Sequence, residues 1–123
     1  MDHALDTVLA ALRAMRPPFL PYEADIHRMV EERLTEAVFS YSHEAKIGKG
    51  CRIDYLVGSV GIEIKKGKPK TPILHRQLQR YASCEAVSAL IVITQRHVRL
   101  PKAIGGKPIA ILVLPQLWGL ALP

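Results

Sequence analysis

The sequence contains few cysteines and few aromatic residues, and it has no long apolar run. Two cysteines in 123 residues, Cys51 and Cys84, are too few for a disulfide framework and favour a cytoplasmic protein with reduced thiols. No window of about 18 residues is uninterruptedly apolar, so neither a membrane span nor a membrane partner is expected. Two Phe, one Trp and four Tyr form no aromatic-rich strand, which argues against recognition of single strands by base stacking.

Several motifs of other protein classes are also missing. The five histidines show no zinc-binding spacing, and the segments GKGCR and IGGKP lack the spacing of a phosphate-binding loop. The N-terminal segment has neither the basic start nor the cleavage site of a signal peptide. Its apolar residues instead predict an amphipathic helix over residues 1–16, with one face made of Leu5, Val8, Leu9 and Leu12.

The composition is that of a globular protein with a basic surface. Apolar residues make up 49% of the chain and charged residues 23%, which predicts a single domain over residues 1–123. The formal net charge is +6, and a surplus of this size in a small domain makes a polyanion a plausible partner.

Apolar periodicity predicts an α/β fold with a mixed central sheet flanked by helices. Helical spacing covers residues 23–39, with apolar positions at 26, 29, 30, 34, 37 and 38, and again residues 73–86. Residues 41–50, 51–57, 60–66, 87–94 and 109–115 are predicted as strands, and residues 67–72 and 95–108 as loops. Residues 107–123 comprise the last strand and an apolar tail around Trp118.

The two strands at 51–57 and 60–66 predict a hairpin with Gly58-Ser59 as a type II′ turn. Counting from the turn pairs alternate residues on an apolar face: Val57–Val60, Tyr55–Ile62 and Ile53–Ile64. The other face carries the remaining pairs: Leu56–Gly61, Asp54–Glu63 and Arg52–Lys65. This segregation supports the register, because a slip of one residue would mix the two faces.

In this register two carboxylates, those of Asp54 and Glu63, lie directly opposite each other. Like charges in this position destabilise a sheet, and a cation between them would remove the repulsion. Mg²⁺ or Mn²⁺ suits oxygen ligands of this kind. Lys65 shares the face of Glu63 and could hold a water or neutralise charge at a phosphoryl group. The alternative is a solvated polar face on which Arg52 and Lys65 balance the acids.

Asp54 and the segment Glu63-Ile64-Lys65 resemble the motif of the PD-(D/E)XK nuclease superfamily. The resemblance covers most of residues 23–94 and includes the expected order of helix, three strands, helix and strand, the restriction-endonuclease-like core (α-β-β-β-α-β). The helix after the motif carries Gln77 and Tyr81 four residues apart, as in many members. The chain departs from the family at residue 53, where Ile53 replaces the proline of the family name.

The resemblance implies a Mg²⁺- or Mn²⁺-dependent phosphodiesterase, a deoxyribonuclease of the endonuclease type. Asp54, Glu63 and the carbonyl of Ile64 would ligate the metal, Lys65 would position or help deprotonate the water, and Gln77 would orient Lys65 or a phosphate. Members also carry a glutamate in the first helix, for which Glu23 is our choice; the rival positions are Glu31, Glu32 and Glu44.

The expected partner is DNA, with RNA as a further possibility, recognised through structure or backbone rather than base sequence. Phosphate contacts are predicted for basic residues after the motif, on the next helix and in the long loop: Lys66, Lys68, Lys70, Arg76, Arg80 and Arg96. The small size favours a homodimer or a partner protein, with the tail around Trp118 as a dimer surface. The alternatives are a non-catalytic nucleic-acid-binding domain and an interaction subunit with a salt-bridged hairpin.

Overall fold

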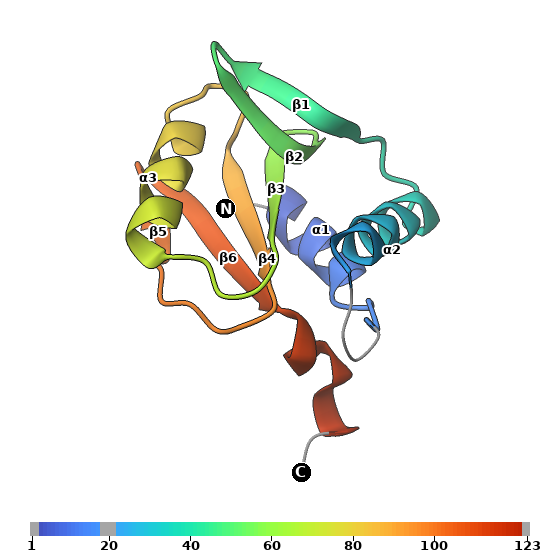
Figure 1. The fold of residues 1–123 in the computed structure, drawn as a ribbon. Coiled ribbons are helices and arrows are strands. Elements are labelled where there is room, and N and C mark those ends of the chain that lie inside the picture. Colours follow the sequence, from blue (N-terminus) through green and yellow to red (C-terminus); the bar gives the residue numbers. More distant parts are fainter. Residues whose placement is uncertain (1–2, 18–21, 122–123) are drawn as a thin grey trace.

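The centre of the fold is a six-stranded mixed sheet with helices on both faces (Figure 1). The computed structural model describes residues 3–17 and 22–121. Within these ranges the elements are, in chain order, α1 (His3–Leu12), α2 (Glu23–Glu36), β1 (Ser42–Gly48), β2 (Cys51–Val57), β3 (Val60–Lys65), α3 (Thr71–Ala82), β4 (Ala89–Thr94), β5 (Ala103–Ile104), β6 (Lys107–Val113) and the 3-10 helix η1 (Leu114–Ala121).

The strands follow the spatial order β1-β2-β3-β4-β6-β5. β1, β2 and β3 are antiparallel neighbours, β3, β4 and β6 run parallel, and β5 is antiparallel to β6. The parallel pairing of β3 and β4 requires a crossover, which α3 provides. The predicted α/β class, with a mixed sheet flanked by helices, is therefore confirmed.

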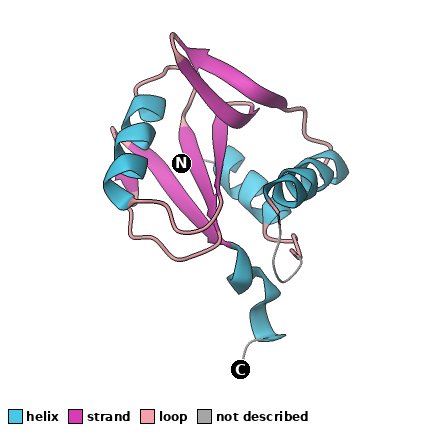
Figure 2. Cartoon of the chain, viewed as in Figure 1, coloured by secondary structure: helices cyan, strands magenta, loops and turns pink. Residues whose placement is uncertain are grey.

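Two apolar clusters lie on opposite faces of the sheet, one against α1 and α2 and the other against α3. Figure 2 shows these helices on either side of the strands. The first, here called the α1/α2-side cluster, packs these two helices against Tyr55, Ile62, Ile91 and other strand residues. The second, the α3-side cluster, packs α3 against Leu90, Val92 and their neighbours. β4 lies between the two clusters and all of its residues are buried, as expected for a central parallel strand.

The first two helices match the predicted apolar faces but are shorter than predicted. Leu5, Val8, Leu9 and Leu12 of α1 are all buried, as expected. α2 ends at Glu36 rather than at residue 39, because Val38 adopts a left-handed conformation with φ of 63°. The N–H of Phe39 then donates to the carbonyl of Leu34 at 2.9 Å, which closes the helix end. Ala37 and Val38 are consequently exposed, and their prediction as part of the buried face is wrong.

α3 begins and ends earlier than its apolar pattern predicts. It starts at Thr71, within the predicted loop, and has Pro72 in its first turn, a position that needs no N–H donor. It ends at Ala82, and the N–H of Ser83 donates back to the carbonyls of Gln79 and Arg80. Residues 83–86 form a turn rather than a last helical turn.

The predicted loop 95–108 contains β5, which sequence reasoning missed. β5 and β6 form a hairpin around Gly105 and Gly106, and this Gly-Gly pair is the signal that could have revealed it. β6 begins at Lys107 and ends at Val113, so it is displaced by two residues from the predicted strand. Leu114, which follows, is buried in the α1/α2-side cluster.

The apolar tail is only partly visible in the structure. Its backbone forms η1, but the predicted dimer surface around Trp118 falls on side chains outside the described residues. In the described part of the chain no helix has the length and apolar character needed to cross a bilayer.

Candidate active site

The predicted site lies on the hairpin of β2 and β3. Gly58 has φ of +60° and supports the predicted two-residue turn. The pairs nearest the turn form as predicted: Val57–Val60, Leu56–Gly61 and Tyr55–Ile62. The pairing ends there, so the prediction is wrong for the outer pairs: Asp54–Glu63, Ile53–Ile64 and Arg52–Lys65.

The hairpin opens because the side chain of Asp54 replaces the backbone of Ile53 as the partner of Ile64 in β3. Asp54 Oδ2 accepts a hydrogen bond from the N–H of Ile64 at 2.8 Å, a donor that the predicted register assigns to Ile53. In a strand the N–H and C=O of one residue point to the same side. The carbonyl of Ile64 therefore also points toward β2 at the place where the two strands separate.

Ile53 lies on the opposite face from the one predicted. It packs in the α3-side cluster, whereas Tyr55 and Ile64 belong to the α1/α2-side cluster. Gly61 leaves the necessary space, because a Cβ there would lie 2.6 Å from Ile53 Cδ1. Residues 53 and 55 would share a face in a regular strand, so β2 is irregular at Asp54, where its pairing with β3 ends.

Glu63 is the central side chain of the site and is only 7% exposed. Its Oε1 accepts a hydrogen bond from the backbone N–H of Asp54 at 3.3 Å. Its Oε2 lies 3.2 Å from Lys65 Nζ and accepts a hydrogen bond of 3.2 Å from Gln77 Nε2. One oxygen thus faces β2 and Asp54, and the other faces the ammonium and the amide.

The surroundings of Glu63 oppose its ionisation. Burial is the largest cause that raises the pKa of its carboxyl group, and the negative charge of Asp54 raises this pKa further. Lys65 acts in the opposite direction but does not cancel the other two effects. The carboxylate form of Glu63 is therefore held at a cost in free energy, which a further cation beside Asp54 would reduce.

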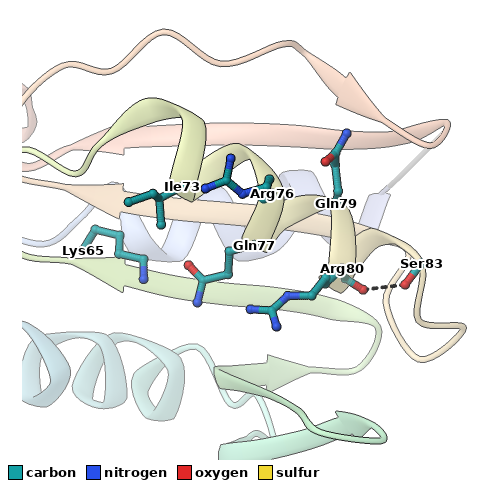
Figure 3. A pocket seen from close by; sticks show the side chains of 7 residues that line it. All are labelled: Lys65, Ile73, Arg76, Gln77, Gln79, Arg80 and Ser83. Atoms are coloured by element: carbon teal, nitrogen blue, oxygen red, sulfur yellow. Dashed lines mark hydrogen bonds between the residues drawn. The ribbon is translucent and has the colours of Figure 1, made fainter.

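Two side chains of α3, those of Gln77 and Tyr81, form a hydrogen-bonded chain that holds Glu63 from the side of this helix. Gln77 Nε2 donates both to Glu63 Oε2 and, at 2.8 Å, to the hydroxyl of Tyr81. That hydroxyl in turn donates to the carbonyl of Arg52 at 3.1 Å. Figure 3 shows Gln77 beside Lys65 below α3. Gln77 was predicted to orient Lys65 or a phosphate; it contacts Glu63, to which Lys65 is also bound.

Phenylalanine in place of Tyr81 is expected to lower the free energy of unfolding by about 1–3 kcal/mol, because the partly buried carbonyl of Arg52 loses its donor and Gln77 loses its acceptor. Urea unfolding followed by circular dichroism measures this loss. Tyr41→Phe is the matched control, since among the described residues the hydroxyl of Tyr41 makes no hydrogen bond. A loss for Tyr41→Phe equal to that for Tyr81→Phe would contradict the structural role of the hydrogen-bonded chain.

Asp54 also lines a cleft of about 560 Å³ that lies between α2 and the start of β1. This cleft contains three of the four proposed first-helix or neighbouring acids, Glu23, Glu31 and Glu44. Glu23 is well exposed, with 59% of its side chain accessible, and lies 3.9 Å from His27. Glu32 lines a different cleft, between the end of α1 and α2, so the structure separates it from Asp54.

A polar cluster beneath this cleft was not predicted. The hydroxyl of Tyr55 donates to Glu31 Oε2 at 2.6 Å and lies 3.1 Å from His27 Nδ1, while the ring of His43 stacks on the Tyr55 ring at 4.7 Å. Burial, followed by the hydrogen bond to Glu31, raises the pKa of Tyr55. Sequence reasoning placed Tyr55 on an apolar face and gave it no polar partner. The helical spacing of His27 and Glu31, one turn apart, was the available signal.

The basic residues predicted to contact phosphate lie on α3 and in exposed loops. Arg76 and Arg80 line a cleft of about 690 Å³ together with Lys65 and Gln77 (Figure 3). The remaining residues are exposed, in the loop between β3 and α3 and after β4: Lys66, Lys68, Lys70 and Arg96. The amino group of Lys66 lies 5.7 Å from the ring centre of Tyr22, which places it beside the start of α2. Most of the charged groups in the cleft beside α2 are thus acidic, and those of α3 in the cleft beside Lys65 are basic.

The oxygen donors available to a cation are few. Among the described residues no group of three or more His, Cys, Asp and Glu side chains is arranged to hold a metal. Asp54 and Glu63 form a pair, to which the carbonyl of Ile64 adds a third oxygen on the same side of β3. Magnesium sites often use one or two carboxylates and complete their coordination with water and substrate phosphate. These donors fit Mg²⁺ or Mn²⁺ and do not fit a zinc site.

Comparison of the chain with protein-family models, with curated proteins and with solved structures finds no match.

Proposed function

We propose that this protein is a metal-dependent nuclease that hydrolyses phosphodiester bonds in DNA. The observation that carries the proposal is the meeting of Asp54, Glu63 and Lys65 where the hairpin opens. The order α2-β1-β2-β3-α3-β4 around this site supports its assignment to the restriction-endonuclease-like core. The resemblance of Asp54 and Glu63-Ile64-Lys65 to the PD-(D/E)XK motif adds the reaction type.

Asp54, Glu63 and the Ile64 carbonyl would hold the metal. Glu63 would bind it through Oε1, since Oε2 already accepts from Lys65 and Gln77. These two donors orient the carboxylate and leave one oxygen turned toward Asp54. A bound Mg²⁺ or Mn²⁺ supplies Lewis acidity toward a phosphoryl oxygen and lowers the pKa of a water ligand.

Lys65 is the side chain that would act on the attacking water. Its ammonium is held by Glu63, and the side chain is 27% exposed and lines the cleft beside α3. From there it would position the attacking water or, after losing its proton, help to deprotonate it. It would also offset the negative charge that develops on the phosphoryl group. Glu23 is well placed to act at the other side of Asp54, from the cleft between α2 and β1.

The distribution of charge indicates how the substrate would lie. Arg76 and Arg80 beside Lys65 would bind phosphates of the strand being cleaved, and the loop lysines and Arg96 would bind phosphates further along it. The acids of the other cleft would repel the same backbone and attract the cation. Contacts of this kind read backbone shape rather than base sequence. A second copy of the chain or a partner protein would supply further contacts to a branched or duplex substrate.

The proposal is tested by incubating the protein with supercoiled plasmid and with a branched DNA junction in Mg²⁺, in Mn²⁺ and in EDTA. We expect nicked or cut products in the presence of either metal and intact DNA in EDTA. Intact DNA in all three conditions, together with salt-dependent binding weakened in Arg76→Ala and Arg80→Ala, would instead establish the non-catalytic binding domain. Absence of both cleavage and binding, for DNA and RNA alike, would favour the remaining alternative, an interaction subunit with a salt-bridged hairpin.

A further inference from the structure

The two cysteines, distant in the sequence, meet on one side of β1. Cys51 is the first residue of β2 and pairs with Gly48 of β1, and Cys84 lies in the turn after α3. A Cβ added at Gly48 would lie 2.9 Å from Cys84 Sγ and 3.8 Å from Cys51 Cβ. Both cysteines therefore occupy the space over this glycine, which only a residue without a side chain leaves free.

The two thiols are neighbours and remain accessible. Burial and the neighbouring Cys84 thiol raise the pKa of Cys51. The Cys84 thiol also donates to the carbonyl of Arg80 at 3.4 Å. Both side chains are partly exposed, so a small reagent can reach them.

The backbones that carry the cysteines are held in place independently of the thiols. Cys51 is fixed by the pairing of β1 and β2. Cys84 donates its N–H to the carbonyl of Tyr81 at 3.0 Å, and its own carbonyl accepts from Lys107 Nζ at 2.8 Å. The fold thus keeps the two sulfurs close without a bond between them.

We propose that Cys51 and Cys84 form a reversible intramolecular disulfide, with a small disulfide such as glutathione disulfide as the oxidant. The thiolate of one cysteine attacks the oxidant, forms a mixed disulfide and releases one glutathione thiolate. The other cysteine loses its proton to solvent, attacks the protein sulfur of the mixed disulfide and releases the second glutathione. Two protein thiols are oxidised, and one glutathione disulfide is reduced to two thiols.

This bond would tie the start of β2 to the end of α3. The same two elements are joined by the hydrogen bond from Tyr81 to the carbonyl of Arg52, next to Cys51. The disulfide would therefore reinforce the contact through which α3 holds Gln77 against Glu63. The proposal concerns thiol chemistry alone and does not depend on nuclease activity.

The test is an equilibrium between the full chain and glutathione buffers of defined composition, quenched with acid and resolved by mass spectrometry. The folded protein is expected to form a monomeric species two hydrogens lighter, with peptides containing Cys51 and Cys84 linked. Its equilibrium constant for this bond should exceed that of the urea-unfolded chain by at least about tenfold, because folding holds the thiols together.

Three variants sharpen the measurement. Cys51→Ser and Cys84→Ser should stop at the mixed disulfide with glutathione, since the chain has only these two cysteines. Gly48→Ala should lower the equilibrium constant of the folded protein, because its methyl group displaces Cys84 Sγ. Equal constants in the folded and unfolded chains, or linkage only between separate molecules, would overturn the proposal.

Discussion

Glutamine in place of Glu63 is expected to lower the rate of metal-dependent DNA cleavage by about 100-fold or more, while the folded protein becomes more stable at neutral pH. The loss of rate follows from the loss of a charged metal ligand, because metal-ion catalysis supplies several kcal/mol of transition-state stabilisation and about 1.4 kcal/mol corresponds to a tenfold rate. Glutamine has nearly the same shape. Its one amide oxygen can accept from the N–H of Asp54, and its NH₂ group can donate to Gln77 if the amide of Gln77 turns over.

The gain in stability follows from the sign of the pKa shift. Burial and Asp54 raise the pKa of Glu63 in the folded state above its ordinary value of 4.5. Between that value and the raised pKa, the folded state binds more protons than the unfolded state, so the free energy of unfolding falls as the pH rises through this window. Glutamine does not titrate and escapes this loss.

Urea unfolding in EDTA at about pH 4 and at about pH 7.5 measures the effect. The lower pH lies below the ordinary pKa of 4.5, where the loss of stability begins, and the higher pH lies above it. We expect Glu63→Gln to be the more stable protein at the higher pH and similar to the wild type at the lower pH. A variant that is less stable than the wild type by the same amount at both values would show that burial of the charge is not the cause.

Methionine in place of Lys65 is expected to lower cleavage by about 10²–10⁴-fold, the range for a positioned group that assists proton transfer. Its effect on stability should be opposite to that of Glu63→Gln. Lys65 Nζ lies 3.2 Å from the buried carboxylate of Glu63, and its removal leaves this charge without its ammonium partner. We expect the free energy of unfolding at neutral pH to fall by about 1–3 kcal/mol.

Lys66→Met is the matched control for Lys65→Met. Lys66 is the next residue in the chain and carries the same charge, but it is exposed and faces the ring of Tyr22. We expect a change in stability within about 0.5 kcal/mol, as for other surface substitutions. Its cleavage rate should fall by less than that of Lys65→Met at any salt concentration. Equal losses of cleavage rate in the two variants would show that Lys65 contributes only general electrostatic attraction of DNA.

The double variant Glu63→Gln/Lys65→Met tests whether the two side chains interact directly. If the loss in Lys65→Met comes from the unpaired carboxylate, a neutral residue 63 should remove most of it. Both single variants and the double variant should cleave DNA poorly. Additive effects on stability would contradict a direct interaction between the two side chains.

The sequence was sufficient to predict the class of fold and the inner half of the hairpin. Alternation of apolar residues, with Gly58-Ser59 as the turn, predicted the three inner pairs that the structure contains. The outer pairs were wrong because counting along two strands assumes that backbone groups bond to each other. Here the carboxylate of Asp54 takes the N–H of Ile64, and no pattern of residue types reveals this exchange.

The candidate site was predictable where neighbours in sequence are neighbours in space. Sequence spacing placed Lys65 on the face of Glu63, and Gln77 and Tyr81 one helical turn apart. In the structure the members of each pair contact each other. How α3 is rotated against the sheet was not predictable, and this rotation makes Glu63 the partner of Gln77. The cluster around Tyr55 was missed for the same reason, because it joins α2 to two strands.

The most direct test of the account compares plasmid cleavage by the wild type and Glu63→Gln in Mg²⁺, with unfolding of both proteins measured in parallel. We predict Mg²⁺-dependent nicking by the wild type and a loss of about 100-fold or more in a variant that is folded and at least as stable at neutral pH. Equal rates of cleavage in the two proteins, or no cleavage by a folded wild type on plasmid or branched DNA, would contradict it.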